Sequence, residues 1–319
     1  MRALVTGAAG FVGAHLLRLL RAQDHDVHAM TLPGETLASD LRELPRHHCD
    51  LTNAEALEAL LSEVAPDWVF HLAAISRPED CRRRPLLAWK VNFFGTQNLY
   101  RLAAEVAPEA RVLFVGTAAQ YGRPGPDELP LTEDSPLNPQ NVYAATKTAG
   151  DLLGAEFALS GRLAVIRVRP FNHTGPGQKP GFVGPDFARQ IARIERGLQE
   201  PKLEVGDLTP ILDFTDVRDV VRAYVLLMEK GEPGAVYNVC SESGRTVREL
   251  LDGLLALTTA KVEVVVPGGR KRKGGADNLV GCAEALHAAT GWMPEIPWEQ
   301  TLRDLLADWR TRADSVNLP

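Results

Sequence analysis

Cysteine is scarce in this 319-residue chain, and no two cysteines form a close pair. Cys49, Cys81, Cys240 and Cys282 are far apart, and no CxxC motif is present. Zinc sites and the disulfide frameworks of secreted proteins need cysteines at short, regular spacings. We therefore expect no metal site and no disulfide framework, and we expect the protein to be cytoplasmic.

Long apolar runs and an excess of positive charge are also missing. Spanning a bilayer takes about 18 or more apolar residues, and no run approaches that length. Gly7, Gly10 and Gly13 interrupt the apolar start, which argues against a signal peptide. Lys and Arg number 35 against 41 Asp and Glu, a net charge of −6, whereas nucleic-acid binding favours a basic surface. We predict neither a nucleic-acid nor a membrane partner.

The first twenty residues have the pattern of a strand, a glycine turn and a helix. A short apolar run at 3–5 precedes Gly7, Gly10 and Gly13, and apolar residues recur at helical spacing from Phe11 onward. In that context the glycines permit a tight turn that brings the backbone close to a pyrophosphate, which the helix N-terminus then binds. This stretch predicts a dinucleotide site.

Strands and helices alternate through the first 170 residues, which predicts an α/β fold with a doubly wound parallel (Rossmann) sheet. We assign 1–170 to a dinucleotide-binding domain, to which the chain returns at about 211–240. Residues 171–210 and 241–319 would form a smaller, interleaved C-terminal α/β lobe that binds substrate.

An acidic residue is missing where NAD-binding sheets usually have one. It normally ends the second strand and binds the ribose hydroxyls. Here the predicted strand 26–30 is followed by Thr31, and the first acidic residue is Glu35. The pattern favours NADP, but no arginine takes the acid's place, so NAD stays possible.

Tyr143 and Lys147 are four residues apart in a predicted helix and therefore share one face. Free tyrosine has a pKa of about 10, and a neighbouring ammonium group lowers it towards neutrality. Thr117 directly follows the predicted strand 110–116. We predict that these side chains form an acid–base site.

Together these motifs resemble the extended short-chain dehydrogenase/reductase family, of the NAD-dependent epimerase/dehydratase type. The resemblance is carried by Thr6-Gly-x-x-Gly10-x-x-Gly13, Asp50-Leu51, His71-Leu-Ala-Ala74, Asn92, Thr117 and Tyr143-x-x-x-Lys147. Within the family, blocks such as Arg169–Gln178 are most similar to reductases of GDP-linked 4-keto-6-deoxyhexoses. This likeness implies NAD(P)H-dependent reduction of a C4 ketone, of the type that converts GDP-4-keto-6-deoxymannose to GDP-rhamnose. It also implies a homodimer formed through helices near 90–106 and 143–160.

The resemblance further implies residue roles. Tyr143 would protonate the C4 oxygen, Lys147 would hold the nicotinamide ribose and lower the tyrosine pKa, and Thr117 would hydrogen-bond the substrate oxygen. Asn92 would support the lysine. The implied cofactor-binding residues are Gly7, Gly10, Phe11, Val12, Gly13, Asp50, Leu51, Leu72, Ala73, Ala74, Asn92, Tyr143, Lys147 and Pro170. The implied substrate-binding residues are Ser76, Gln120, Asn172, His173, Arg189, Val205 and Arg272.

Three departures from the family pattern bear on the reaction and the substrate. Related dehydratases carry an acid one or two residues after the catalytic Ser/Thr, where this chain has Ala118 and Ala119. Reductases of this group usually carry an arginine where this chain has Leu212, so a guanidinium partner for diphosphate is lost. The usual Arg-Pro-x-Asp element is altered at 272–275, and its carboxylate is missing or displaced to Asp277.

Two alternatives stay open. One is an epimerase or atypical dehydratase, in which hydride leaves and returns on a bound NAD(P) without net turnover. The other is a non-catalytic sensor that kept the cofactor fold, although such a protein has no need of Thr117, Tyr143 and Lys147 together.

Overall fold

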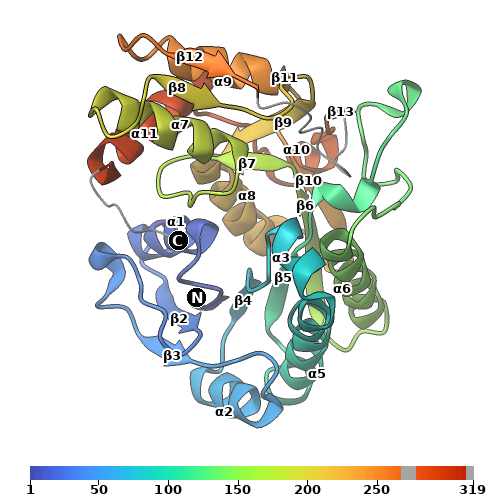
Figure 1. Cartoon of the computed structure of the whole chain (residues 1–319). Helices are drawn as coiled ribbons and strands as arrows, with labels where there is room; N and C mark the ends of the chain where they lie inside the picture. Colours follow the sequence, from blue (N-terminus) through green and yellow to red (C-terminus); the bar gives the residue numbers. More distant parts are fainter. Residues whose placement is uncertain (267–277, 314–319) are drawn as a thin grey trace.

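The computed structural model describes residues 1–266 and 278–313. Its centre is a sheet of seven parallel strands, with helices packed around it (Figure 1). The strand order is β10-β6-β5-β4-β1-β2-β3. The strands are β1 (Arg2–Thr6), β2 (Asp26–Thr31), β3 (Arg46–His48), β4 (Trp68–His71), β5 (Arg111–Val115), β6 (Ala164–Pro170) and β10 (Val236–Val239). The order reverses between β1 and β4, so the predicted doubly wound α/β fold is confirmed.

Helices cover both faces of this sheet. They are α1 (Phe11–Ala22) and α8 (Val217–Lys230) on one face, and α2 (Ala54–Val64), α5 (Gly95–Val106) and α6 (Val142–Leu159) on the other. Successive side chains of β1 alternate between the two faces: Ala3 and Val5 pack with Leu16 of α1, whereas Leu4 packs with Leu57 of α2. Both faces are therefore buried, as parallel sheets require.

A smaller lobe lies above the carboxyl ends of the strands, in yellow, orange and red in Figure 1. A four-stranded sheet contains β7 (Asn172–Thr174), β9 (Ile211–Asp216), β11 (Gly244–Thr246) and β13 (Asn278–Leu279), and a two-stranded sheet contains β8 (Lys202–Glu204) and β12 (Glu263–Val265). Three helices pack against one another there: α7 (Val183–Glu195), α9 (Val247–Leu255) and α11 (Trp298–Arg312). A further helix, α10 (Glu284–Thr290), contacts α8 and β10.

The short helical elements are η1 (Ser39–Leu41), α3 (Pro78–Arg83), α4 (Pro85–Ala88), η2 (Trp89–Phe94), η3 (Ala118–Tyr121) and η4 (Pro126–Glu128).

The structure differs from the sequence-based expectations in two segments. The chain returns to the large sheet with α8 and β10, later than the expected residue 211, because β9 pairs with β7, β11 and β13. The helix expected near 90–106 is divided between η2 and α5, and η2 is a π-helix that contains Asn92. Such π-turns occur frequently at functional sites.

The turn after β1 lies directly against the segment after β4. Gly7 has a φ of +67°, and a Cβ at this position would lie 2.8 Å from the Ala73 backbone nitrogen. A Cβ on Gly13 would lie 2.6 Å from the Gly7 carbonyl oxygen, so α1 also packs tightly on the turn. Only glycine fits both contacts, and the close packing lies where the strand order reverses.

We predict that Gly7→Ala destabilises the fold by more than its backbone strain alone. Gly161→Ala is a matched control, because Gly161 has a φ of +69° and a Cβ placed there would meet nothing within 4 Å. The control should lose about 1–2 kcal/mol, and Gly7→Ala should lose a further ~1–3 kcal/mol from overpacking. Urea denaturation of both variants measures the difference, and equal losses would contradict the proposed close contact.

Candidate functional site

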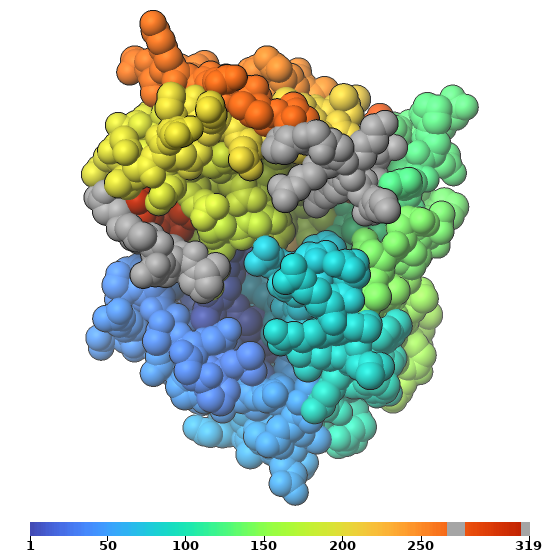
Figure 2. Space-filling model, viewed as in Figure 1, coloured from blue at the N-terminus to red at the C-terminus, as the bar shows by residue number. Residues whose placement is uncertain are grey.

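The carboxyl ends of β1, β4 and β5 gather the predicted cofactor and catalytic residues at one edge of the large sheet. The glycine turn follows β1, Leu72–Ala74 follow β4, and Thr117 follows β5, while α6 supplies Tyr143 and Lys147. Figure 2 shows a hollow beside this edge, between the dark blue N-terminal residues, the cyan segment and the yellow-green lobe. Open α/β sheets bind ligands at such an edge.

The glycine turn fits a dinucleotide pyrophosphate. Gly10 is the N-cap of α1, and no acidic residue occurs in the first turn, which begins with Phe11 and Val12. The free backbone N–H groups and the positive end of the helix dipole therefore meet no competing carboxylate. Because the tight packing at Gly7 requires glycine, no side chain at this position separates the turn backbone from a ligand.

Three other predicted cofactor residues lie at or just after the ends of strands of the large sheet. Asp50 and Leu51 follow β3, where the exposed Asp50 carboxylate accepts from the Thr52 N–H at 2.8 Å. Leu51 is buried, and its carbonyl accepts from Asn98 Nδ2 at 3.0 Å. Pro170 is the last residue of β6 and pairs with Val239 of β10. These contacts hold the loops in place. That Asp50, Leu51 and Pro170 bind a cofactor stays a prediction.

The tyrosine and lysine lie in a largely buried setting. Lys147 is buried, with its Nζ 4.7 Å from the centre of the Phe114 ring, and Tyr143 is partly exposed. Burial raises the pKa of Tyr143 to about 12, and a hydrogen bond with Thr117 opposes the rise. Burial lowers the pKa of Lys147 to about 8, opposed by the Asp151 carboxylate.

The expectation that Lys147 lowers the Tyr143 pKa is therefore not met in this structure. Removing the phenol from water disfavours its charged form, and this effect exceeds the stabilising hydrogen bond from Thr117. Tyr143 keeps its proton at neutral pH, which suits a group that donates a proton.

A buried histidine joins the end of β1 to the helix that carries Asn92. Thr6 Oγ1 lies 3.0 Å from His71 Nδ1, and His71 Nε2 lies 2.8 Å from Thr96 Oγ1. The Thr96 hydroxyl donates to the Asn92 carbonyl at 2.7 Å, so it accepts from His71 Nε2–H. Burial lowers the pKa of His71 to about 3, so the ring is neutral. Its Nδ1 then accepts from Thr6, whose oxygen accepts from the Ala73 N–H at 3.1 Å.

Asn92 continues this chain of hydrogen bonds to the catalytic helix. Its Oδ1 accepts from the Ile75 N–H at 2.8 Å, and its Nδ2 donates to the Ile75 carbonyl and to Thr146 Oγ1, both at 3.1 Å. Thr146 donates to the Tyr143 carbonyl at 2.8 Å. The Asn92 amide is thus fully used, and its expected support of Lys147 stays a prediction.

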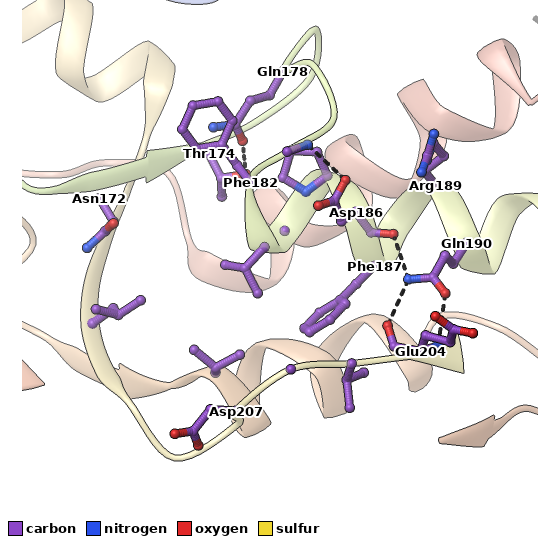
Figure 3. Close-up of a pocket in the computed structure, with 18 of the residues that line it drawn as sticks. Asn172, Thr174, Gln178, Phe182, Asp186, Phe187, Arg189, Gln190, Glu204 and Asp207 are labelled. Atoms are coloured by element: carbon purple, nitrogen blue, oxygen red, sulfur yellow. Dashed lines mark hydrogen bonds between the residues drawn. The ribbon is translucent and has the colours of Figure 1, made fainter. Parts of the chain in front are cut away.

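A cavity of about 950 Å³ opens in the smaller lobe and includes four of the predicted substrate residues. Asn172 and His173 of β7, Arg189 of α7 and Val205 after β8 all line it. Figure 3 shows Asn172 on one side and Arg189 with Gln190 on the other. Further lining residues that the sequence did not single out are Phe182, Asp186, Phe187, Gln190, Glu204 and Asp207.

The cavity adjoins the glycine turn. The His173 ring stacks on Phe11 of α1, with centroids 6.2 Å apart and an interplanar angle of 11°. Nearby, His15 Nε2 lies 2.8 Å from the Pro176 carbonyl oxygen. The wall of the cavity and the first turn of α1 are therefore in contact, so a ligand in the cavity lies next to the sheet edge.

Two predicted substrate residues lie elsewhere, and one falls outside the described residues. Gln120 is fully buried, and its amide bonds the Thr117 N–H and Asp151, so it is not free to contact substrate as expected. Ser76 is exposed in the segment before α3. Arg272, together with the displaced Asp277, is not among the described residues.

Leu212 occupies the position where an arginine was expected. It is 7% exposed and lines the cavity, so this stretch of the wall is apolar. Arg245 of β11 pairs with Leu212 across the small sheet and therefore lies on the same face. Its guanidinium lies 5.2 Å from the Trp298 ring centre and donates to Ser243 at 2.6 Å.

Comparison with known proteins identifies the family. The model of the NAD dependent epimerase/dehydratase family matches residues 3–240. The chain belongs to the NAD dependent epimerase/dehydratase family. It is 37% identical to GDP-6-deoxy-D-mannose reductase of Pseudomonas aeruginosa, over 98% of each chain.

Solved structures of epimerase/dehydratase proteins superpose on nearly the whole chain. RMD from Pseudomonas aeruginosa complexed with NADPH has a TM-score of 0.87 and 36% identity, covering 98% of this chain and 100% of that one. UDP-glucose 4-epimerase of Thermotoga maritima with UDP-glucose has a TM-score of 0.90 and 26% identity, covering 98% and 100%. The predicted family is confirmed.

The epimerase/dehydratase motifs did not reveal every residue that orders this site. Asp151, Arg167 and Arg169 form a buried ionic cluster that Gln120 links to the Thr117 backbone. The sequence contained one indication of the cluster, because Asp151 lies four residues after Lys147 and thus on the same helical face.

Within the described ranges, no helix is long and apolar enough to cross a membrane.

We predict that Thr96→Val destabilises this family member more than Thr148→Val does. Both threonines are buried helical residues that donate to the carbonyl four residues earlier, but only Thr96 also accepts from His71. Leaving a buried donor unsatisfied costs about 1–3 kcal/mol, so Thr96→Val should exceed its control by that amount. Thermal or urea unfolding measures the difference, and equal losses would show that the His71 link contributes nothing.

Proposed function

We propose that this chain is an NADPH-dependent reductase that converts the C4 ketone of GDP-4-keto-6-deoxymannose to an alcohol, giving a GDP-rhamnose-type product. The observation that carries the proposal is the grouping of Thr117, Tyr143 and Lys147 beside the glycine turn, with no acid at 118 or 119. The named Pseudomonas aeruginosa reductase and its NADPH complex support it.

The residues at the sheet edge suit a reduction. When bound, NADPH supplies the hydride for the carbonyl carbon. Tyr143, protonated at neutral pH, donates its phenolic proton to the ketone oxygen as the alcohol forms. The Thr117 hydroxyl gives that oxygen a second hydrogen-bond donor, and the Lys147 ammonium binds ribose hydroxyls of the cofactor.

The side chains after Thr117 favour a reductase over the other activities of the family. A 4,6-dehydratase must move a proton while water is eliminated across C5 and C6, and neither Ala118 nor Ala119 can transfer one. An epimerase on bound NAD(P) stays the second candidate, because relatives that bear the epimerase name share the fold.

The end of β2 supports NADP over NAD. No carboxylate follows Thr31 until Glu35, whose Oε2 accepts from the Leu32 N–H at 2.9 Å. That carboxylate is committed to the loop backbone, whereas NAD-selective sheets direct one to the ribose. The relative solved with NADPH supports the same choice.

The placement of the site residues supports a separate ligand for each lobe. We propose that 1–170 with α8 and β10 binds the dinucleotide, and that the small lobe binds the sugar nucleotide through Asn172, His173, Arg189 and Val205. Ser76 and Arg272 remain predicted substrate contacts.

The four unpaired cysteines favour a reducing compartment, which supports a cytoplasmic location.

The proposed activity predicts stoichiometric consumption of NADPH. With GDP-4-keto-6-deoxymannose, the near-ultraviolet absorbance of NADPH should fall steadily, one NADPH for each sugar reduced, and Tyr143→Phe should slow turnover by about 100-fold or more. Tyr237→Phe is the matched control, since that hydroxyl only accepts from the Glu232 N–H. The proposal fails if no 4-keto sugar nucleotide consumes NADPH while an unoxidised sugar nucleotide is converted.

The lowered pKa of Lys147 predicts an alkaline limit to activity. The ammonium is charged below its pKa of about 8 and loses its proton as the pH rises through that value. Because kcat/KM reports the free enzyme, kcat/KM for NADPH should fall above about pH 8. Lys147→Arg stays charged, so its residual activity should show no such limb. A wild-type profile that is flat to about pH 10, the ordinary range of lysine, would contradict this role.

We also propose that the protein forms a homodimer through the helices near α5 and α6. Large apolar side chains are exposed on this side: Leu86 of α4 at 84%, Phe94 of η2 at 52%, and Leu152 and Leu159 of α6 at 55% and 85%. η2 and α4 both contact α6, so these residues belong to adjoining elements. Exposed apolar side chains on adjoining elements favour burial against a second copy.

Sedimentation equilibrium tests the dimer. The wild-type chain should sediment at twice its 34.8 kDa mass, and Leu152→Glu should sediment as a monomer. Leu198→Glu is the matched control, because Leu198 is 42% exposed but follows α7 in the small lobe. A wild-type monomer, or dissociation by both variants alike, would refute this interface.

A further inference from the structure

A buried carboxylate, Asp151, lies one helical turn beyond Lys147 on α6. It is fully buried and pairs with two arginines of β6, Arg167 at 2.8 Å and Arg169 at 3.0 Å. Burial alone would raise the pKa of Asp151, but Arg169, Gln120 and Arg167 together lower it. Asp151 therefore keeps its negative charge between the two arginines.

Gln120 connects that charge to the turn that carries Thr117. Its Nε2 donates to Asp151 Oδ2 at 2.9 Å, and its Oε1 accepts from the Thr117 N–H at 2.8 Å. A Cβ on Gly116 would clash with that Oε1, so the glycine makes room for the amide. With Asp151 able only to accept, the amide is oriented with its oxygen towards Thr117.

We propose that Gln120 and Asp151 are positioning residues for the reduction: they tie the turn of Thr117 to the helix of Tyr143 and Lys147, and so set the spacing of the two hydroxyls around the ketone oxygen. This inference rests on the proposed function. Thr117 and Tyr143 lie on different elements, separated by the long segment 118–141. A displacement of about 1 Å at a reacting group can cost about 100-fold in rate.

The contacts of the cluster predict which steps it affects. Among the described residues, Gln120 and Asp151 make no hydrogen bond to the glycine turn or to Leu72–Ala74, and Gln120 is not among the residues that line the cavity. Removing the Gln120 bonds should therefore slow the chemical step and leave cofactor and substrate binding unchanged. A purely structural role would lower stability without this selectivity.

Gln120→Met is the first test, because it keeps the side-chain length and removes both hydrogen bonds. We expect kcat to fall by about 10–100-fold. The KM for GDP-4-keto-6-deoxymannose and the Kd for NADPH should stay within about 3-fold of wild type, which is less than a tenfold change in affinity. The isotope effect from NADPH deuterated at its transferable position should increase as hydride transfer becomes rate-limiting. Tyr121→Phe is the matched control, since that hydroxyl bonds Arg169 and Asn238 but not Gln120.

A charge relocation tests the link itself. Gln120→Glu alone places two carboxylates side by side, and Asp151→Asn alone leaves Arg167 and Arg169 without a carboxylate. The double variant restores one carboxylate to the cluster and keeps an acceptor for the Thr117 N–H, so it should recover about 10-fold of the kcat that Asp151→Asn loses. If Asp151→Asn does not fold, Gln120→Met still decides the proposal.

A readout without turnover separates this proposal from the proposed function. With 3-fluorotyrosine at the five tyrosines, the fluorine resonance of Tyr143 should shift in Gln120→Met and stay in place in Tyr121→Phe. A wild type that does not consume NADPH would refute the proposed function alone. An unshifted Tyr143 resonance, an unchanged kcat, or a loss of kcat that Tyr121→Phe reproduces would overturn the positioning role.

Discussion

Burial of the Tyr143–Lys147 pair is the constraint on which the candidate catalytic site at the sheet edge depends. Water would favour the charged forms of both groups, and its exclusion raises the pKa of the phenol to about 12 and lowers that of the ammonium to about 8. At neutral pH the pair then consists of a proton donor beside a cation. That combination suits the reduction of a ketone, where the oxygen must gain a proton as its carbon gains hydride.

Two polar networks hold this pair among elements distant in sequence. One runs from Thr6 through His71, Thr96 and Asn92 to the helix of Tyr143. Buried polar groups are costly unless every donor and acceptor is used, so satisfied networks of this kind fix one arrangement. The second, through Asp151, approaches the same helix from the Thr117 side. The contact between the glycine turn and the end of β4 also depends on small residues, because side chains in the turn would prevent it.

The sequence predicted what depends on local spacing. The glycine turn, the Tyr143–Lys147 face and the alternation of strands and helices each follow from residues within a few turns of one another, and the fold and family predictions were confirmed. Contacts between distant segments were missed. Gln120 was assigned to substrate from the family resemblance, whereas its amide bonds the Thr117 N–H and Asp151, which lies 31 residues away. The return to the large sheet was expected from about residue 211, whereas β9 pairs outside that sheet with β7, β11 and β13, which come from three separate segments.

The reaction proposed for this chain passes hydride from NADPH to C4 of a sugar nucleotide and leaves it there. Turnover of GDP-4-keto-6-deoxymannose with NADPH deuterated at the transferable position, followed by nuclear magnetic resonance of the product, is the decisive measurement. We predict one deuterium at C4 of a 6-deoxyhexose for each NADPH oxidised. A product without deuterium at C4, or a C4 epimer formed while NADPH stays reduced, would contradict this transfer.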